Sequence, residues 1–204
     1  NTMFGDINYI DATSASSAEL VYDVIQELGV PLDREISEYL LVAVSTDTGH
    51  FQYSNTQPDT LHFAAELLEA GANIQKMSND VYKRRTEGMT RLIGRALEHL
   101  DVFSGGKAAI LWLSEADYED CGAESADSEG MVDYGRDIDT VEIACFMRGE
   151  KDGAKVSLRS KGKIDVAKLS QTMGGGGHKG AAGLFLKMDL PKAVEHMKRI
   201  MTEA

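Results

Sequence analysis

Residues 174–183 read Gly-Gly-Gly-Gly-His-Lys-Gly-Ala-Ala-Gly, the most distinctive stretch of the chain. Every position apart from His178 and Lys179 is glycine or alanine. Because glycine has no Cβ, consecutive backbone N–H groups can converge on an anion, and the two longer side chains would add donors. The stretch therefore predicts a phosphate-binding loop. The alternative is a flexible linker, but linkers are typically rich in serine and do not run into an Ala-Ala-Gly strand start.

The residues around this stretch are basic, although the chain as a whole is acidic. Its 204 residues contain 21 Lys and Arg against 33 Asp and Glu, a formal net charge of −12. Between positions 148 and 187, however, nine basic residues stand against three acidic ones. Arg159, on a predicted strand, can bind a phosphate bidentately, and its alternative is a solvated charge on an exposed sheet face. The overall acidity excludes wrapping of duplex DNA by bulk charge but not local phosphate contacts.

A second candidate site is the turn Thr46-Asp47-Thr48-Gly49. It follows an apolar segment that we predict to be helical from Arg34 to about Thr46. A carboxylate at the end of such an element is well placed to hold a hard cation, and His50 could line the same site. Aspartic proteases also use Asp-Thr-Gly, but they need two such loops and a mostly β fold, so that interpretation is excluded.

Hydrophobic periodicity places the elements around these motifs. Strands are predicted at 107–113, 141–147, 154–160 and 183–188. Helices begin near Ser16, with Ser16 and Glu19 as a capping box, and near Asp33, Pro58, Asp165 and Pro191. A long helix is predicted from Asn73 to Leu100, as a semi-rigid connector. Strands alternating with helices indicate α/β architecture in both halves of the chain.

Composition excludes several other classes. No apolar run approaches the ~20 residues of a membrane-spanning helix. Cys121 and Cys145 are too few for a disulfide framework and lack zinc-ligand spacing, which predicts reduced thiols in a cytoplasmic protein. The polar start of the sequence, at Asn1, has no strand before it and is expected to lie in mid-fold.

Taken together, these motifs resemble those of the DHH/DHHA1 phosphoesterases, the superfamily of RecJ-like exonucleases and bacterial nanoRNases. Gly174–Gly183 is similar to the GGGHxxAAG signature of the DHHA1 domain, and Ser45–Phe51 looks like the fourth motif of the DHH domain. Asn1–Glu19 looks like the stretch that follows the Asp-His-His motif. Ser157–Ser160 is similar to the nanoRNase and 3′-phosphoadenosine 5′-phosphate phosphatase type.

The resemblance implies an α/β fold in three parts. Residues 1–72 would be the C-terminal part of a DHH domain, 73–104 a helical linker, and 105–204 a DHHA1 substrate-binding domain with a mixed sheet. It also implies that two manganese ions hold the phosphate and activate a water for attack on phosphorus. Asp47 matches a catalytic metal ligand, and the residues that match substrate-binding positions are Arg159, Gly175, Gly176, Gly177 and His178.

The implied function is hydrolysis of short oligoribonucleotides, of 3′-phosphoadenosine 5′-phosphate, or of both. Short single-stranded RNA or a nucleotide would be the partner, without a membrane, and a homodimer is compatible with the sequence. The family's Asp-rich first motif, second-motif Asp and Asp-His-His are absent and would lie upstream of Asn1. One carboxylate cannot hold two metals, so this chain alone is expected to be inactive.

The alternative is a nucleotide-phosphate-binding or nucleic-acid-binding module without hydrolytic activity. A DHHA1 module of the alanyl-tRNA-synthetase type is disfavoured because such modules lack the half that carries Asp47. The sequence leaves open the choice among RNA, DNA, dinucleotide and mononucleotide substrates, and the oligomeric state.

Overall fold

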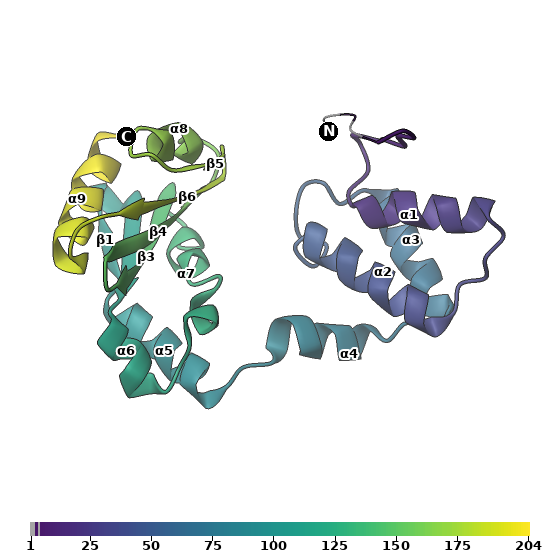
Figure 1. Ribbon diagram of the computed structural model, residues 1–204, viewed down its shortest axis with the longest axis horizontal. Coiled ribbons are helices and arrows are strands. Elements are labelled where there is room, and N and C mark those ends of the chain that lie inside the picture. The colour runs from purple at the N-terminus through teal and green to yellow at the C-terminus, as the bar shows by residue number, and fades with distance from the viewer. Residues whose placement is uncertain (1–2, 4) are drawn as a thin grey trace. The chain divides into compact units, whose positions relative to one another are not determined.

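The computed structural model describes residues 3 and 5–204. By its contacts the chain divides into two compact units, Asn1–Arg84 and Arg85–Ala204, called unit 1 and unit 2 below. In Figure 1 the colours from purple to blue follow unit 1, and those from teal to yellow follow unit 2.

Unit 1 is built from helices around a small apolar core. They are α1 (Ser17–Glu27), α2 (Arg34–Asp47), α3 (Pro58–Glu69) and α4 (Ile74–Ser78), followed by a π-helical turn, Asn79–Lys83. Leu41, Val44 and Leu67 are fully buried between α2 and α3. Asp33 caps α2 by accepting from the Ile36 N–H at 2.8 Å, so the predicted helix is confirmed.

The predicted capping box of α1 is confirmed only in part. The Ser16 side chain accepts from the Ala18 N–H, as an N-cap residue does. Glu19 does not return to the Ser16 N–H, however; its Oε2 accepts from the N–H of Ala15 at 2.8 Å. Glu19 therefore accepts from the residue before the N-cap instead of from the N-cap itself.

Two sequence predictions for this half of the chain are wrong. The described residues of unit 1 contain no strand, so the α/β pattern holds for unit 2 alone. The single helix from Asn73 to Leu100 is interrupted after Lys83, because Arg84 is extended and Thr86 caps a new helix by accepting from the Met89 N–H at 2.9 Å.

Unit 2 contains a six-stranded sheet in the order β1-β2-β3-β4-β6-β5. The strands are β1 (Asp101–Phe103), β2 (Ala108–Leu113), β3 (Ile143–Glu150), β4 (Gly153–Ser160), β5 (Gly176–His178) and β6 (Ala181–Leu186). β2 and β3 are parallel and the other pairs are antiparallel, which confirms the predicted mixed sheet. The two short strands were not predicted, and β5 lies inside the glycine run.

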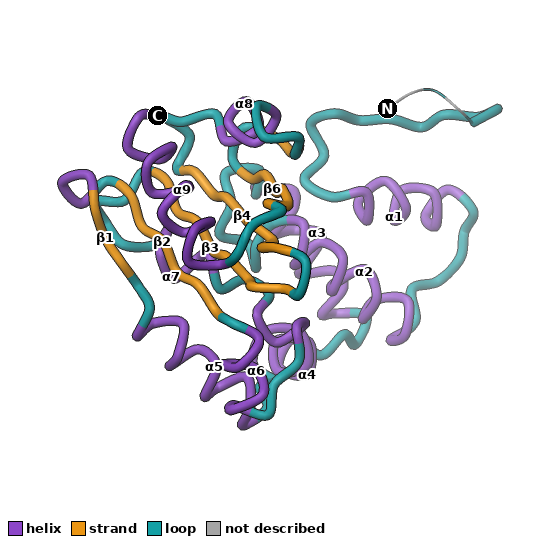
Figure 2. Tube along the Cα trace, turned by 60° about the vertical axis from the view of Figure 1, so that its left-hand side comes forward, coloured by secondary structure: helices purple, strands orange, loops and turns teal. Residues whose placement is uncertain are grey.

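Helices cover the two faces of the sheet differently (Figure 2). They are α5 (Glu87–Glu98), α6 (Glu115–Cys121), α7 (Val132–Arg136), α8 (Val166–Gln171) and α9 (Leu190–Glu203). On one face, α8 and α9 pack against Val156 and Leu158 of β4. On the other face, α5, α6 and α7 pack over β2 and β3, where Leu111 and Phe146 are buried. This second layer of helices leaves β6 and β5, at the other end of the sheet, less covered.

Side chains alternate along β4, which separates the core from the surface. Ala154, Val156 and Leu158 are completely buried. Residues between them point to the opposite face, because successive side chains of a strand alternate. The registers with β6 and β5 place further residues on that same face. We call this surface the open face; it consists of Lys155, Ser157, Arg159, Gly176, His178, Ala181, Gly183 and Phe185.

Among the described residues, none of the helices is both long and apolar enough to span a bilayer.

Candidate functional site

One row of the open face brings together two of the residues predicted from the sequence. Arg159 on β4 lies opposite Ala181 on β6, which lies opposite His178 on β5. Directly opposite residues project to the same face, and two strand spacings separate the outer backbones by about 10 Å. The small Ala181 between them leaves room above the sheet. Arg159 and His178 can therefore reach one anion from two sides.

The Arg159 guanidinium is available to such an anion. One Nη1–H donates to the Leu158 carbonyl at 3.0 Å. Within the described part of the chain, no carboxylate forms an ion pair with Arg159, whereas Arg148 and Lys163 each have one and Arg136 has two. A planar guanidinium with donors left over is suited to bidentate phosphate binding.

The next row of the open face carries almost no side chains. Ser157 lies opposite Gly183, which lies opposite Gly176. Gly183 and Gly176 are both exposed, and a Cβ built on Gly176 would meet no atom within 4 Å. A flat ligand can therefore approach the backbone of β6 and β5 at this row.

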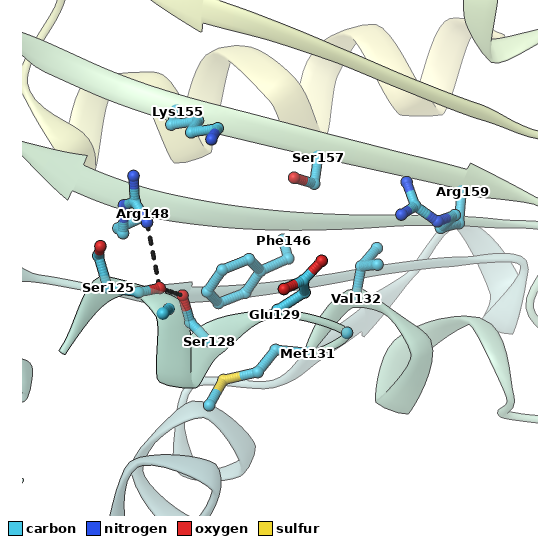
Figure 3. Close-up of a pocket in the computed structure, with 12 residues that line it drawn as sticks. Ser125, Ser128, Glu129, Met131, Val132, Phe146, Arg148, Lys155, Ser157 and Arg159 are labelled. Carbon is cyan, nitrogen blue, oxygen red and sulfur yellow. Dashed lines mark hydrogen bonds between the residues drawn. The ribbon is translucent and has the colours of Figure 1, made fainter. Parts of the chain in front are cut away.

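A cavity of about 400 Å³ adjoins the open face at β4 (Figure 3). Lys155, Ser157 and Arg159 project from β4, with Arg148 on the neighbouring strand and Glu129 on the opposite wall. Arg148 is neutralised by Glu150 at 2.6 Å and donates to the Ser125 carbonyl at 3.2 Å. Glu129 is the one acidic residue among those lining the cavity. The cavity and the open face share Lys155, Ser157 and Arg159.

The first two glycines of the motif use their backbone N–H groups within the fold. The N–H groups of Gly174 and Gly175 donate to Gln171 and Ser170 carbonyls at 3.1 and 2.9 Å, where they close α8. A Cβ on Gly175 would collide with Ser170 and Gly183. These two N–H groups thus do not converge on an anion, and the predicted loop is instead a helix end followed by strand β5.

Gly177 is required by close packing and by its backbone. Its φ of +148° lies in the region that favours glycine, and a Cβ there would collide with the backbone of Ala181 and Ala182. Of the three glycines predicted to bind substrate, Gly176 and Gly177 are exposed, and Gly176 alone leaves open space where a side chain would stand. Contacts to phosphate are therefore expected from side chains more than from the glycine backbone.

In unit 1, Asp47 is the last residue of α2, and its side chain is exposed. The hydroxyl of Ser16, the N-cap of α1, donates to Asp47 Oδ2 at 2.6 Å. Asn55 Nδ2 donates to the Asp47 carbonyl at 3.2 Å and to the Ala15 carbonyl at 3.1 Å. The carboxylate is thus oriented by a neighbouring helix while one side faces solvent.

The turn after Asp47 is held by the completely buried Thr48. Its hydroxyl donates to the Val44 carbonyl at 2.6 Å and accepts from the Phe51 N–H at 3.1 Å. Gly49, His50 and Phe51 follow with φ of 56°, 59° and 63°. Such consecutive left-handed residues are uncommon and mark this turn as tightly specified.

His50 serves the structure of unit 1. Its Nδ1 lies 3.1 Å from the Ser45 hydroxyl, which lies 2.9 Å from the Tyr82 hydroxyl. The His50 and Tyr82 rings also pack with centroids 4.8 Å apart. In the described part of the chain, no hydrogen bond or ion pair joins His50 to Asp47. The expectation that His50 lines a site with Asp47 therefore stays a prediction.

The residues present do not fit a pair of manganese ions by themselves. Among residues 3 and 5–204, no group of three or more His, Cys, Asp or Glu side chains is placed to hold a metal ion. Asp47 is one carboxylate with a serine beside it, and a two-metal site needs several such ligands.

Comparison with known proteins places these sites in a family. Residues 105–203 match the family model described as the DHHA1 domain. Over 204 residues, the chain is 35% identical to a Thermus thermophilus protein named bifunctional oligoribonuclease and PAP phosphatase NrnA, covering 100% of this chain and 61% of that protein. A Bacillus subtilis protein of the same name is 25% identical over 183 residues, or 88% of this chain and 58% of that protein.

A solved structure shows the same fold. An exopolyphosphatase-related protein from Bacteroides fragilis matches with a TM-score of 0.91 and 27% identity, over 98% of this chain and 60% of that one. The chain spans about 60% of the length of the curated relatives it matches. Residues 105–203 are thus a DHHA1 domain, and over its full length the chain is similar to a portion of proteins of the oligoribonuclease and PAP phosphatase type.

Proposed function

We propose that this chain is the nucleotide-binding part of a phosphoesterase that hydrolyses short oligoribonucleotides, 3′-phosphoadenosine 5′-phosphate, or both. The observation that carries the proposal is the row Arg159–Ala181–His178 on an otherwise small-residue sheet face. The names of the Thermus thermophilus and Bacillus subtilis relatives support the choice of substrates.

In this proposal the residues of the open face have separate tasks. Arg159 binds the terminal phosphate through two parallel N–H···O bonds, and His178 donates to the same phosphate from the far side. The backbone around Gly176 and Gly183 supports the sugar or base, since no side chain stands above it. Binding would be weakened by salt, because the phosphate contacts are ionic.

We propose further that Asp47 is one ligand of the manganese pair. Manganese, when bound, would stabilise charge on the phosphate and activate a water. The remaining ligands would come from the part of the relatives' length that this chain does not match. The chain's own contribution is to orient the Asp47 carboxylate through the Ser16 hydroxyl at 2.6 Å.

A second candidate function is nucleotide binding without hydrolysis. The specific observation in its favour is that the described residues bring no three metal-ligand side chains together. In both candidates the cytoplasm is the proposed location, because Cys121 and Cys145 are both free thiols, as is usual in a reducing compartment.

The test is a titration of 5′-AMP into isotopically labelled protein, followed by NMR. We expect the amide signals of Gly176, His178 and Arg159 to shift and Arg159→Ala to remove the effect. Lys192→Ala is the matched control, because Lys192 lies on α9 at the opposite face of the sheet. Unshifted open-face amides at millimolar AMP would contradict the proposal.

Hydrolysis separates the two candidate functions. With manganese and a dinucleotide, we expect no turnover by this chain, because Asp47 alone cannot hold two metals. Turnover by the same residues within a longer protein would favour the phosphoesterase. Its absence there would favour the binding module.

A further inference from the structure

The open face has a second end that the proposed phosphate site does not use. Lys155 on β4 lies directly opposite Phe185 on β6, four residues along β4 from Arg159. Both side chains are exposed, and Phe185 retains 40% of its surface. These two side chains are not part of the core, and the proposed phosphate site does not use them.

The Phe185 ring lies on the open face itself. A Cβ built on Gly153 would come within 2.9 Å of the ring, so the ring covers Gly153 at the β3–β4 hairpin. Gly153 and Lys155 lie on the same side of β4, because side chains two residues apart share a face. The ring therefore approaches the hairpin through Cε1 and Cζ, and its exposed remainder is available to a ligand.

Lys155 is a cation that, among the described residues, has no acidic partner. Arg148, opposite it on β3, forms an ion pair with Glu150 at 2.6 Å, which removes that carboxylate from competition. In the described part of the chain no Asp or Glu forms an ion pair with Lys155, whereas Lys163 and Lys192 each have one. The lysine is thus free for an anionic ligand.

The backbones of the two cationic residues lie far enough apart for each side chain to bind its own phosphate. Four residues of a strand span about 13 Å, and this distance separates the backbone of Lys155 from that of Arg159. Between them lies the row of Ser157, Gly183 and Gly176, which has no side chain larger than a hydroxymethyl group. A ligand in which each of the two side chains binds its own phosphate is extended, carries at least two phosphates and lies against the sheet.

We propose that Lys155 and Phe185 form a second nucleotide subsite, in which Phe185 stacks on a base and Lys155 binds a backbone phosphate. The inference rests on the proposed function and specifies its substrate class: single-stranded oligonucleotides of at least two nucleotides rather than mononucleotides. Stacking of bases on aromatic side chains of an exposed sheet is an established way of binding single-stranded RNA, and it tolerates any base.

The test compares affinities for 5′-AMP and for the 5′-phosphorylated diadenylate by isothermal titration calorimetry. We expect the diadenylate to bind about tenfold more tightly than AMP, the usual order of effect for one stacked base. Phe185→Ala should remove that advantage and leave AMP binding within about twofold. Phe185→Trp should retain the advantage, because a larger ring still stacks.

Matched controls separate stacking and charge from general surface effects. Tyr39→Ala removes an exposed aromatic side chain from unit 1, and Lys192→Ala removes a lysine from α9; neither should change the diadenylate affinity. Lys155→Ala should weaken the diadenylate several-fold at low salt and little at high salt, because the contact is ionic.

The outcomes distinguish the inference from the function on which it rests. Equal affinities for AMP and diadenylate, or a diadenylate affinity unchanged in Phe185→Ala, would overturn the second subsite and leave the proposed function standing. A loss of AMP and diadenylate binding together in Phe185→Ala would also overturn it, since the ring would then act on the whole face. Failure of AMP to bind the wild-type chain would instead overturn the proposed function.

Discussion

Unit 1 and unit 2 present their candidate functional side chains in different ways. In unit 1 a single carboxylate, Asp47, stands at a helix end and is oriented by Ser16 from a neighbouring helix. In unit 2 the strand register places Arg159 and His178 in one row across three strands. In the proposed function, the first arrangement would supply one metal ligand and the second would supply most of the nucleotide-binding surface. Binding and catalysis are thus expected to separate in this chain.

The largest effect should come from Asp47. In a protein that contains this chain together with the remaining length of its relatives, we expect Asp47→Asn to lower turnover by on the order of a hundredfold or more, because a metal ligand acts on the charge of the transition state. Stability should change by less than about 1 kcal/mol, since Asp47 is exposed and an asparagine oxygen still accepts from Ser16. Wild-type turnover with unchanged metal content would remove Asp47 from the site.

The next largest effect tests the packing of unit 2. Gly175→Ala should lower the free energy of unfolding by about 2–3 kcal/mol, because the added Cβ collides with Ser170 and Gly183. Gly176→Ala is the matched control and should cost under about 1 kcal/mol, since its Cβ meets nothing within 4 Å. Urea unfolding followed by the fluorescence of Trp112, the one tryptophan of the chain, reports on unit 2. Equal midpoints for the two variants would contradict the assigned close approach.

A smaller effect is expected from Arg159 on nucleotide affinity. Arg159→Ala should weaken 5′-AMP binding by about 1.5–3 kcal/mol, the range for hydrogen bonds to charged groups. Arg159→Lys should lie between the wild type and Ala, because lysine keeps the charge and loses the bidentate geometry. Calorimetric titration measures all three. Equal affinities for Lys and wild type would mean that charge alone matters at this position.

The smallest effect concerns unit 1 at high pH. The hydrogen bond to Glu66, followed by burial and the Glu66 charge, raises the pKa of Tyr22 to about 12 from 10.0. The neutral phenol is thereby favoured in the folded state, so its contribution is complete below pH 10 and lost as pH rises from 10 to about 12. The partly exposed site keeps this contribution below about 1 kcal/mol.

Tyr22→Phe provides the measurement for this pH effect. The difference in tyrosinate absorbance between wild type and variant should titrate near pH 12, above the pKa of 10.0 of an ordinary tyrosine. A difference titration centred at pH 10 would show that the contact with Glu66 does not persist in solution.

Local signals were enough to predict several elements of the fold. Asp33 before an apolar run predicted the start of α2, and Asp165 predicted the start of α8. Both depend on a few neighbouring residues. The strand β5 could not be predicted, because three residues of Gly-Gly-His have no strand propensity. The strand β5 is held in place by its pairing with β6. The residues that close α8 lead the chain into this pairing.

The candidate site shows the same division between local and long-range information. Arg159 and His178 were predicted from charge and motif, but their shared row depends on a register transmitted through Ala181. Lys155 was counted only as part of a basic window, and Phe185 was not singled out. The alternation of Lys155, Ser157 and Arg159 with three apolar residues was the signal that could have placed Lys155 on the same face as Arg159.

That alternation on β4 also links mutational tolerance to recognition. A one-residue shift of β4 would turn Lys155, Ser157 and Arg159 into the core and Ala154, Val156 and Leu158 toward the solvent. A single-residue insertion in the strand would therefore cause misfolding and would not yield a folded protein with an altered open face. Exchange of residues at the odd-numbered positions leaves the core untouched. Changes in ligand preference can therefore arise at those positions one substitution at a time, without passing through an unfolded intermediate sequence.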